Sequence, residues 1–128
     1  MRLVRRSSSR IALLVDSSLN SSSGAKLKEL KCAIYAFSVD ELRFFRPNRV
    51  IDSLKRFAVI GVLEKRSQSG GFWGRGFEAL ASSFYVTGFR PLLVDFISVG
   101  PWVDIPRISE VLKRAYFTGI LEEPVFEV

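Results

Sequence analysis

The sequence contains no histidine and only one cysteine, Cys32. Without histidine, the chain lacks imidazole acid–base catalysis and the Ser-His and Cys-His nucleophilic pairs. A single cysteine excludes a disulfide within the chain, and the two shortages together leave almost no way to build a zinc site. We therefore expect no catalytic residues, no cofactor and no metal. Cys32 itself lies off the apolar stripe of its segment, so we expect an incidental, partly exposed thiol near Lys28 and Lys31.

The sequence also lacks long apolar runs, and no acidic residue precedes Asp16. No run approaches the 18 or more apolar residues of a membrane span. Residues 1–24 form a basic, serine-rich segment whose composition resembles a mitochondrial transit peptide, although Ile11–Val15 is too short for the apolar core of a secretory signal. Between these readings we favour a cytoplasmic protein with a loosely ordered N-terminus and no membrane contact.

The composition is apolar and the charge is unevenly distributed. Hydrophobic residues make up 48% of the 128 residues, and 11 are phenylalanine. This length suits one domain, whose apolar surplus either fills a phenylalanine-rich core or faces a partner. Residues 1–66 hold 14 Lys and Arg against 6 Asp and Glu, whereas residues 67–128 hold 5 against 7. A basic first half suits contact with phosphate or with an acidic partner.

Apolar spacing and capping signals predict three helices in the first half. Leu27, Leu30 and Ile34 recur at helical spacing, which predicts a helix over 25–37. Ser38 followed by Glu41 forms a capping box for a short helix over 39–45. A third helix over 48–60 would follow Pro47 and end at Gly61.

Strands and further helices are predicted downstream. We expect a hairpin of strands 62–66 and 83–87 around a glycine-rich loop, followed by helices over 88–98 and 107–117, the last ending at Gly119. Ile11–Val15 fits either a strand or a buried helical turn.

Residues 38–66, SVDELRFFRPNRVIDSLKRFAVIGVLEKR, resemble the helix-turn-helix of winged-helix domains, and residues 84–93, FYVTGFRPLL, resemble the second wing strand and the helix after it. The resemblance implies an α+β fold, a winged helix-turn-helix with extra helices on the C-terminal side. It divides the chain into a basic N-terminal segment (1–24), a winged-helix domain (25–98) and a C-terminal helical extension (99–128). The loop over 67–82 is longer than most wings.

The same resemblance implies a nucleic-acid surface. In DNA-binding winged helices the third helix enters the major groove and the wing touches the backbone. The residues that would contact double-stranded DNA are Arg46, Asn48, Arg49, Ser53, Lys55 and Arg56 on the helix and Arg75 on the wing. Asp52 on the same helix face would repel phosphate. This is the alternative hypothesis, a DNA-binding transcription regulator.

We favour a non-enzymatic adaptor subunit of a larger assembly, with a protein partner and no small-molecule substrate. The element order is similar to the middle components of bacterial three-component ABC-ATPase systems, which accompany an SMC-like ATPase and serve in antiviral defence. Phe72, Trp73 and Trp102 fall in expected loops, and loop aromatics often anchor protein interfaces.

A third hypothesis is a Mg²⁺-dependent nuclease. Asp16 and Asp95 each end a Leu-Val-Asp run, and IALLVDSSLN resembles the opening of PIN-like nucleases, with Asp104 as a possible third ligand. Carboxylates at the ends of parallel strands can hold Mg²⁺, so a parallel sheet led by residues 11–15 would favour this hypothesis over the winged helix. The segment GGFWGRG lacks the Lys-Ser/Thr ending of a phosphate-binding loop.

Overall fold

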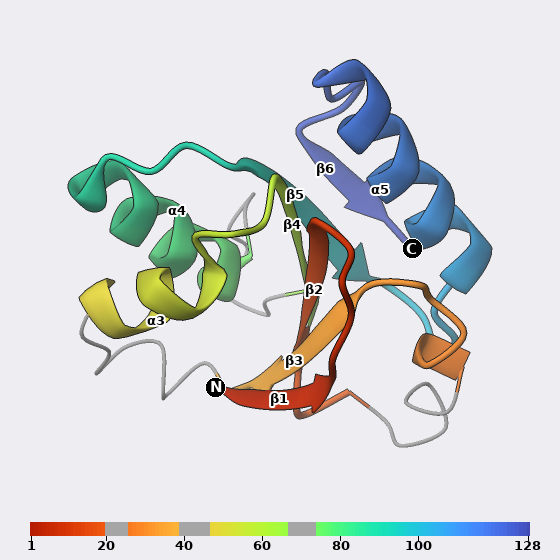
Figure 1. Cartoon of the computed structure of the whole chain (residues 1–128). Helices are drawn as coiled ribbons and strands as arrows, with labels where there is room; N and C mark the ends of the chain where they lie inside the picture. Colours follow the sequence, from red (N-terminus) through yellow and green to blue (C-terminus); the bar gives the residue numbers. More distant parts are fainter. Residues whose placement is uncertain (20–25, 39–46, 67–73) are drawn as a thin grey trace.

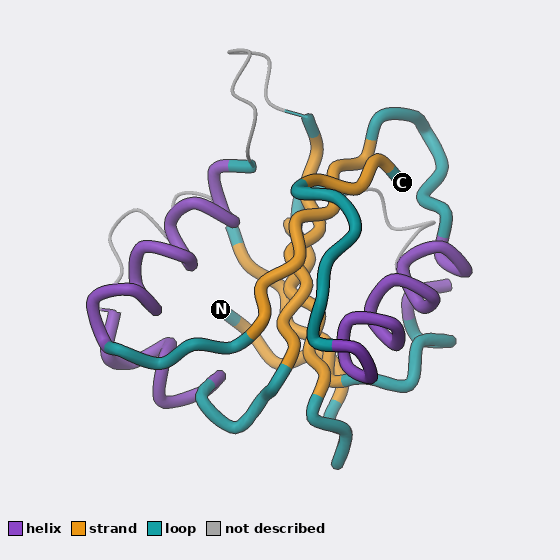
Figure 2. Tube along the Cα trace, turned by 90° about the horizontal axis from the view of Figure 1, so that it is seen from above, coloured by secondary structure: helices purple, strands orange, loops and turns teal. Residues whose placement is uncertain are grey.

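The structure is a computed structural model, and it describes residues 1–19, 26–38, 47–66 and 74–128. Helices cover both faces of a central sheet, so the molecule has three layers (Figures 1 and 2). The strands are β1 (Arg2–Arg5), β2 (Ile11–Asp16), β3 (Ala33–Phe37), β4 (Val59–Lys65), β5 (Leu92–Ser98) and β6 (Val125–Glu127). The helices are α3 (Pro47–Leu54), α4 (Arg75–Thr87) and α5 (Ile105–Thr118).

The sheet has the order β1-β3-β2-β4-β5-β6, and every neighbouring pair is parallel except β1 with β3. The chain passes from β2 to β3 on one side and then crosses back to β4 on the other side of β2. This reversal is the topological switch point of a doubly wound sheet, and ligands of such folds bind outside the carboxyl ends of the strands there. The carboxyl ends of β2 and β4 are therefore the first place to look for a site.

Two apolar clusters fill the space between the layers. Successive residues of a strand point to opposite faces, and the central strands are apolar on both. Leu13 and Val15 join the cluster under α5, whereas Ala12 and Leu14 join the cluster under α3 and α4. Burial on both faces explains why β2, β4 and β5 read as nearly continuous apolar runs.

Helix α5 confirms the prediction of a helix over 107–117. The carboxylate of Asp104 caps its first turn by accepting from the Arg107 N–H at 3.1 Å. Its inward residues are Ile108, Val111, Leu112 and Ala115. Gly119 ends the helix as predicted, with a φ of 70° that side chains with a Cβ rarely adopt.

The connections through α4 and α5 differ in hand. Both lead from one strand to its next neighbour in the same direction along the sheet, yet α4 packs on one face and α5 on the other. The two crossovers therefore have opposite hands, although parallel connections are right-handed almost without exception. The connection through α5 ends in β6, which has only three residues.

The winged-helix prediction is wrong, because the structure has a six-stranded mixed sheet where that fold has a small hairpin. Residues 33–37 of the expected helix over 25–37 form β3, with Ile34 inside the sheet. The expected helix over 39–45 lies outside the described residues. The third helix ends at Leu54, and Gly61 lies in the middle of β4. A Cβ on Gly61 would lie 2.9 Å from Phe96 and 3.1 Å from Leu112, so this glycine lets α5 approach the sheet.

In the second half of the predicted winged helix, the expected strand is helical and the expected helix contains a strand. Residues 83–87, expected as a strand, form the end of α4, and residues 88–98, expected as a helix, contain β5. The N-terminal segment is ordered in β1 and β2, and the sheet draws strands from all three of the expected segments of the chain. Cys32 is buried, and burial raises the pKa of its thiol to about 11 although the charge of Arg5 lowers it, so the expected exposed thiol is also wrong.

Candidate functional site at the carboxyl edge of the sheet

Three carboxylates meet near the carboxyl ends of the central strands. Asp16 ends β2, and the β2–β4 register, which pairs Val15 with Leu63, places it beside Glu64. Asp95 on β5 pairs with Val62, so it lies one step deeper in the sheet than Glu64. The alternation of side chains puts all three on the face covered by α3 and α4. This cluster, Asp16, Glu64 and Asp95, lies at the switch point of the fold.

The N-terminus of α4 is docked onto two of these carboxylates. Glu64 accepts from the Gly76 N–H at 2.9 Å and from the Phe77 N–H at 3.0 Å, one with each oxygen. Asp95 accepts from the Gly74 N–H at 3.1 Å through Oδ2. These are the amides that a helix leaves without internal partners. Side chains of β4 and β5 thus cap α4, whose own N-cap residue, Gly74, has no side chain to do so.

Glycine is required where α4 meets the carboxylates. A Cβ on Gly74 would overlap the Glu64 carboxylate. A Cβ on Gly76 would lie 2.8 Å from the Phe37 ring and 3.2 Å from Glu64 Oε2. Neither glycine has a positive φ, so the requirement is for space and not for backbone freedom. The close approach of α4 to the sheet therefore explains why residues 74 and 76 are glycine.

Two carboxyl groups of the cluster, those of Glu64 and Asp95, have a raised pKa, and burial is the main cause in both. Burial is the main cause of the raised pKa of Asp95, about 6, and the charges of Glu64 and Glu78 add to it while the Gly74 N–H lowers it. Burial also raises the pKa of Glu64, against two backbone hydrogen bonds and with help from Asp16 and Glu78. Asp16 accepts from the Ser18 N–H at 2.9 Å. Glu64 and Asp95 therefore bind protons more readily than ordinary carboxyl groups do.

One oxygen of Asp95 has no hydrogen-bond partner among the described residues. The side chain is completely buried, and this oxygen is Oδ1. Leaving a buried acceptor unsatisfied costs about 1–3 kcal/mol. A protonated carboxyl group lowers this cost, because it carries no charge, and this agrees with the raised pKa of Asp95.

The cluster does not fit a Mg²⁺ ion. Both oxygens of Glu64 and one oxygen of Asp95 already accept backbone N–H groups. The N-terminus of a helix carries partial positive charge, which favours anions and opposes a cation. Among the residues that the structure describes, no group of three or more acidic or cysteine side chains is arranged to hold a metal ion. Asp104, the expected third ligand, is occupied as the N-cap of α5.

The cluster also fills the place where a doubly wound fold binds phosphate. In such folds a helix N-terminus at the carboxyl edge cradles the anion with its free amides. Here the amides of Gly74, Gly76 and Phe77 point at the protein's own carboxylates. Asp16 and Asp95 were predicted from the sequence as candidate ligands, whereas Glu64 was not, although it also ends an apolar run.

The predicted nucleic-acid residues are only partly brought together. Arg49, Ser53, Lys55 and Arg56 are exposed along α3 and the turn after it, whereas Arg75 begins α4, the helix that packs beside α3 on the same face of the sheet. Lys55 pairs with Asp52 at 3.7 Å. Arg46 lies outside the described residues, and for Asn48 only the helical backbone is described. Because residues 75–87 form α4 and not part of a wing, the described residues do not present this set as a winged helix would.

Of the predicted interface residues, Trp102 is described and is exposed at 68%. Its ring lies 5.9 Å from the Lys26 ammonium group, while Phe72 and Trp73 lie outside the described residues. Two exposed apolar groups were not predicted from the sequence. They are the α4 patch, formed by Tyr85, Val86 and Phe89, and the α5 patch, formed by Tyr116, Phe117 and Ile120.

No protein-family model matches the chain, and no curated protein matches it either. Within the described residues, no helix is long and apolar enough to cross a membrane.

Proposed function

We propose that this chain is a non-enzymatic adaptor that binds a protein partner through the α5 patch. The observation that carries the proposal is the exposure of Phe117 at 81% and Ile120 at 68%, beside Tyr116 at 41%. Large apolar side chains grouped on a surface mark interaction sites more often than isolated ones do. Aromatic residues are also the side chains most enriched at the energetic centre of interfaces.

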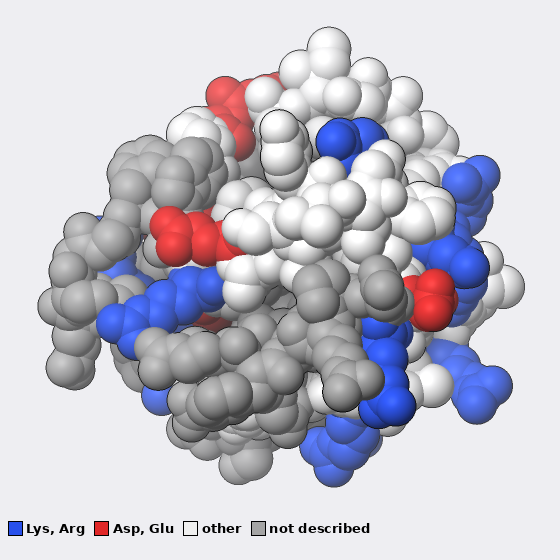
Figure 3. All heavy atoms as spheres, turned by 90° about the vertical axis from the view of Figure 1, so that its left-hand side faces the viewer, with Lys and Arg blue, Asp and Glu red and all other residues white. Residues whose placement is uncertain are grey.

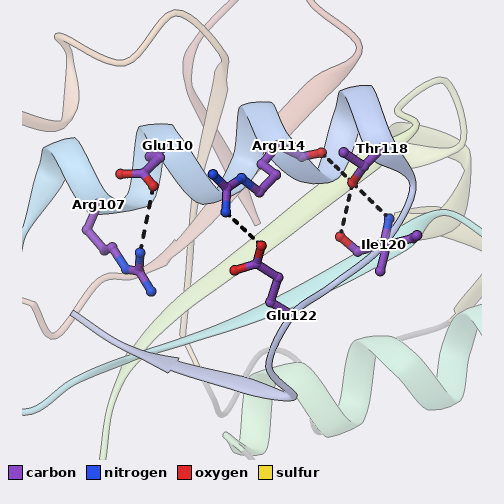
Figure 4. A network of polar contacts seen from close by, with 6 residues as sticks. All are labelled: Arg107, Glu110, Arg114, Thr118, Ile120 and Glu122. Carbon is purple, nitrogen blue, oxygen red and sulfur yellow. Dashed lines mark hydrogen bonds and ion pairs between the residues drawn. The ribbon is translucent and has the colours of Figure 1, made fainter.

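The α5 patch is held in a fixed shape by polar contacts around it (Figure 4). Thr118 donates to the Arg114 carbonyl at 2.8 Å, and its hydroxyl accepts from the Ile120 N–H at 3.2 Å. Arg114 also pairs with Glu122 at 2.7 Å, which ties the chain after the helix back to it. The Tyr116 and Phe117 rings meet edge to face, with centroids 5.6 Å apart. A patch ordered before binding loses little conformational entropy on binding.

The arrangement of the fold supports this assignment over an enzyme. The carboxyl edge, where doubly wound folds bind small ligands, is filled by the cluster and by the start of α4. Helices α4 and α5 both run back from this edge, so their last turns lie at the opposite, amino edge (Figure 1). Both exposed apolar patches are therefore far from the closed site.

Capture of the partner with matched variants tests the proposal. The tagged chain is purified from its native host as wild type, as Phe117→Asp and as Lys113→Asp. Lys113 is exposed on the same helix but belongs to no apolar patch. We expect the wild type and Lys113→Asp to retain a stoichiometric protein, and Phe117→Asp to lose it by at least tenfold, because hot-spot truncation costs about 2 kcal/mol or more.

Two results would contradict the adaptor function. One is a wild-type chain that is monomeric, stable and without any bound protein. The other is equal capture by wild type and Phe117→Asp when circular dichroism shows that both are folded. In the second case the partner binds elsewhere, and the same comparison with Tyr85→Asp and Trp102→Asp would locate its site.

A further inference from the structure

A basic pocket lies at the opposite side of the sheet from α5, between the β1–β2 loop and α3. It has a volume of about 650 Å³, within the range of small-ligand pockets. The polar residues that line it are Arg6, Ser7, Ser8, Tyr35, Ser53 and Arg56. Figure 3 shows several Lys and Arg side chains along its right-hand edge. This edge is the side of the molecule that faces the viewer in Figure 1, where β1 lies at the front.

Arg56 is fixed in position before any ligand arrives. Its guanidinium group donates to the Ser7 carbonyl at 3.2 Å and to the Ser9 carbonyl at 3.3 Å. The same group lies 3.9 Å from the centre of the Phe57 ring. A guanidinium group has five N–H donors, so donors remain for a ligand. An arginine held in this way is suited to bidentate recognition of a phosphate.

The described charges that line the pocket are positive. Among the described residues, no acidic residue lines the pocket, and neither Arg6 nor Arg56 forms an ion pair with a carboxylate. The acid on the neighbouring face of α3, Asp52, pairs with Lys55. The C-terminal end of α3 would oppose an anion, but the carbonyl oxygens of Ile51 and Leu54 there accept backbone N–H groups.

Hydroxyl groups complete the set of donors. Ser7 Oγ accepts from the Ser9 N–H at 3.1 Å, which leaves its own hydrogen to donate. Ser8 is exposed on the same loop, and the half-buried Tyr35 lines the floor beside it. Phosphate oxygens accept several hydrogen bonds at once, and contacts to nucleic-acid phosphates come from arginine, serine and tyrosine side chains.

We infer that this pocket binds a phosphate group, with Arg6 and Arg56 as its charged donors. The phosphate belongs either to the backbone of a nucleic acid or to a free phosphorylated molecule such as a nucleotide. The site is separate from the α5 patch, so it stands or falls independently of the adaptor function. Of the residues expected to contact DNA, only Ser53 and Arg56 line this pocket. Its other polar lining residues come from β3 and from the loop between β1 and β2.

Binding is measured by fluorescence anisotropy with labelled single-stranded and duplex oligonucleotides, and by calorimetry with pyrophosphate and adenosine monophosphate. The full chain is used as wild type, Arg6→Gln, Arg56→Gln and Lys113→Gln. Lys113→Gln makes the same charge change on α5. We expect Arg6→Gln and Arg56→Gln to weaken binding about tenfold or more, and each to lower the salt slope by about one, while Lys113→Gln has no effect.

The two kinds of binding measurement distinguish the two sources of the phosphate. Binding of an oligonucleotide but not of pyrophosphate assigns the site to a nucleic-acid backbone, and comparable binding of pyrophosphate or the mononucleotide assigns it to a free phosphorylated molecule. Arg56 donates to the β1–β2 loop, so Arg56→Gln can also disturb the structure of that loop. Arg6→Gln is therefore the decisive variant, because Arg6 has no ion pair within the described residues. The proposal is overturned by absence of saturable binding at low salt, or by equal losses in Arg6→Gln and Lys113→Gln.

Discussion

At the scale of single residues, Asp95 is the most unusual group in the molecule. It is completely buried near Glu64, and one of its oxygens has no hydrogen-bond partner within the described part of the chain. A folded-state pKa of about 6, above the ordinary value of 3.8, means that the folded protein binds a proton more tightly than the unfolded chain does. The stability that this group contributes is full below pH 3.8 and is lost as the pH rises through about 6.

The Asp95→Asn variant tests this linkage. Asparagine keeps an oxygen to accept the Gly74 N–H but cannot ionise. We expect the free energy of unfolding of Asp95→Asn, relative to wild type, to increase by roughly 2 kcal/mol between pH 4.5 and pH 7.5. Urea denaturation at both pH values measures it. A relative stability that does not change with pH would show that the carboxyl group of Asp95 titrates normally.

Sequence reasoning at this scale succeeded where one residue determines the local backbone. Gly119 was predicted to end a helix and does so, because its positive φ favours glycine. It failed where partners are distant in the chain. Gly61 was expected to end a helix but is required by the approach of Phe96 and Leu112, neither of which its neighbours in the sequence reveal. Glu64 was missed for the same reason.

At the scale of elements, the contact between α4 and the sheet depends on small residues. Alanine is a better helix former than glycine by about 1 kcal/mol, so in an unconstrained helix Gly76→Ala would stabilise the protein. Here the new Cβ would meet the Phe37 ring at 2.8 Å and the Glu64 carboxylate at 3.2 Å. The two effects have opposite signs, and the structure predicts that the steric one is larger.

We expect Gly76→Ala to lower the free energy of unfolding by roughly 1–3 kcal/mol, as overpacking does in other cores. Gly100→Ala is the matched control, since nothing lies within 4 Å of a Cβ there, and we expect it to change stability by less than about 0.5 kcal/mol. Thermal or urea denaturation compares the three proteins. If Gly76→Ala is as stable as wild type, the docking of α4 on Glu64 is looser than described.

The segments 83–87 and 92–98 show why apolar periodicity gave the wrong secondary structure. Residues 92–98 are buried on both faces of the sheet except at their start, so their apolar pattern does not alternate and fits a helix as well. Residues 83–87 contain Phe84, Tyr85 and Val86, which favour strands, yet they end α4. Tertiary packing overrides local preference here, whereas α5 has a clear single stripe and was predicted correctly.

At the scale of the whole molecule, a parallel sheet led by β2 is the arrangement that would suit a nuclease. The structure places Asp16 and Asp95 on the same face near this edge, but on strands separated by β4. Glu64 on β4 and Asp95 accept hydrogen bonds from the N-terminus of α4. The edge that would hold Mg²⁺ is thereby occupied by backbone amides. The basic pocket and the two apolar patches lie elsewhere on the surface, which is consistent with a protein that binds and does not cleave.

We expect the purified chain to show no Mg²⁺-dependent cleavage of RNA or DNA. The assay uses labelled single-stranded and duplex substrates with 5–10 mM Mg²⁺ or Mn²⁺, and EDTA as the control. Cleavage by wild type that disappears in both Asp16→Ala and Asp95→Ala would contradict this prediction and would establish the cluster as a catalytic centre. Cleavage that persists in both variants would indicate a contaminating nuclease.

Hydrogen–deuterium exchange of the chain, free and bound to its captured partner, tests the central claim most directly. The adaptor account predicts slower amide exchange on binding over residues 114–121, which contain the α5 patch, and unchanged exchange over 74–77, where the amides are already bonded to Glu64 and Asp95. Protection of the segments around Glu64, Gly74 and Asp95, with no change over 114–121, would contradict it and would place the functional site at the carboxyl edge.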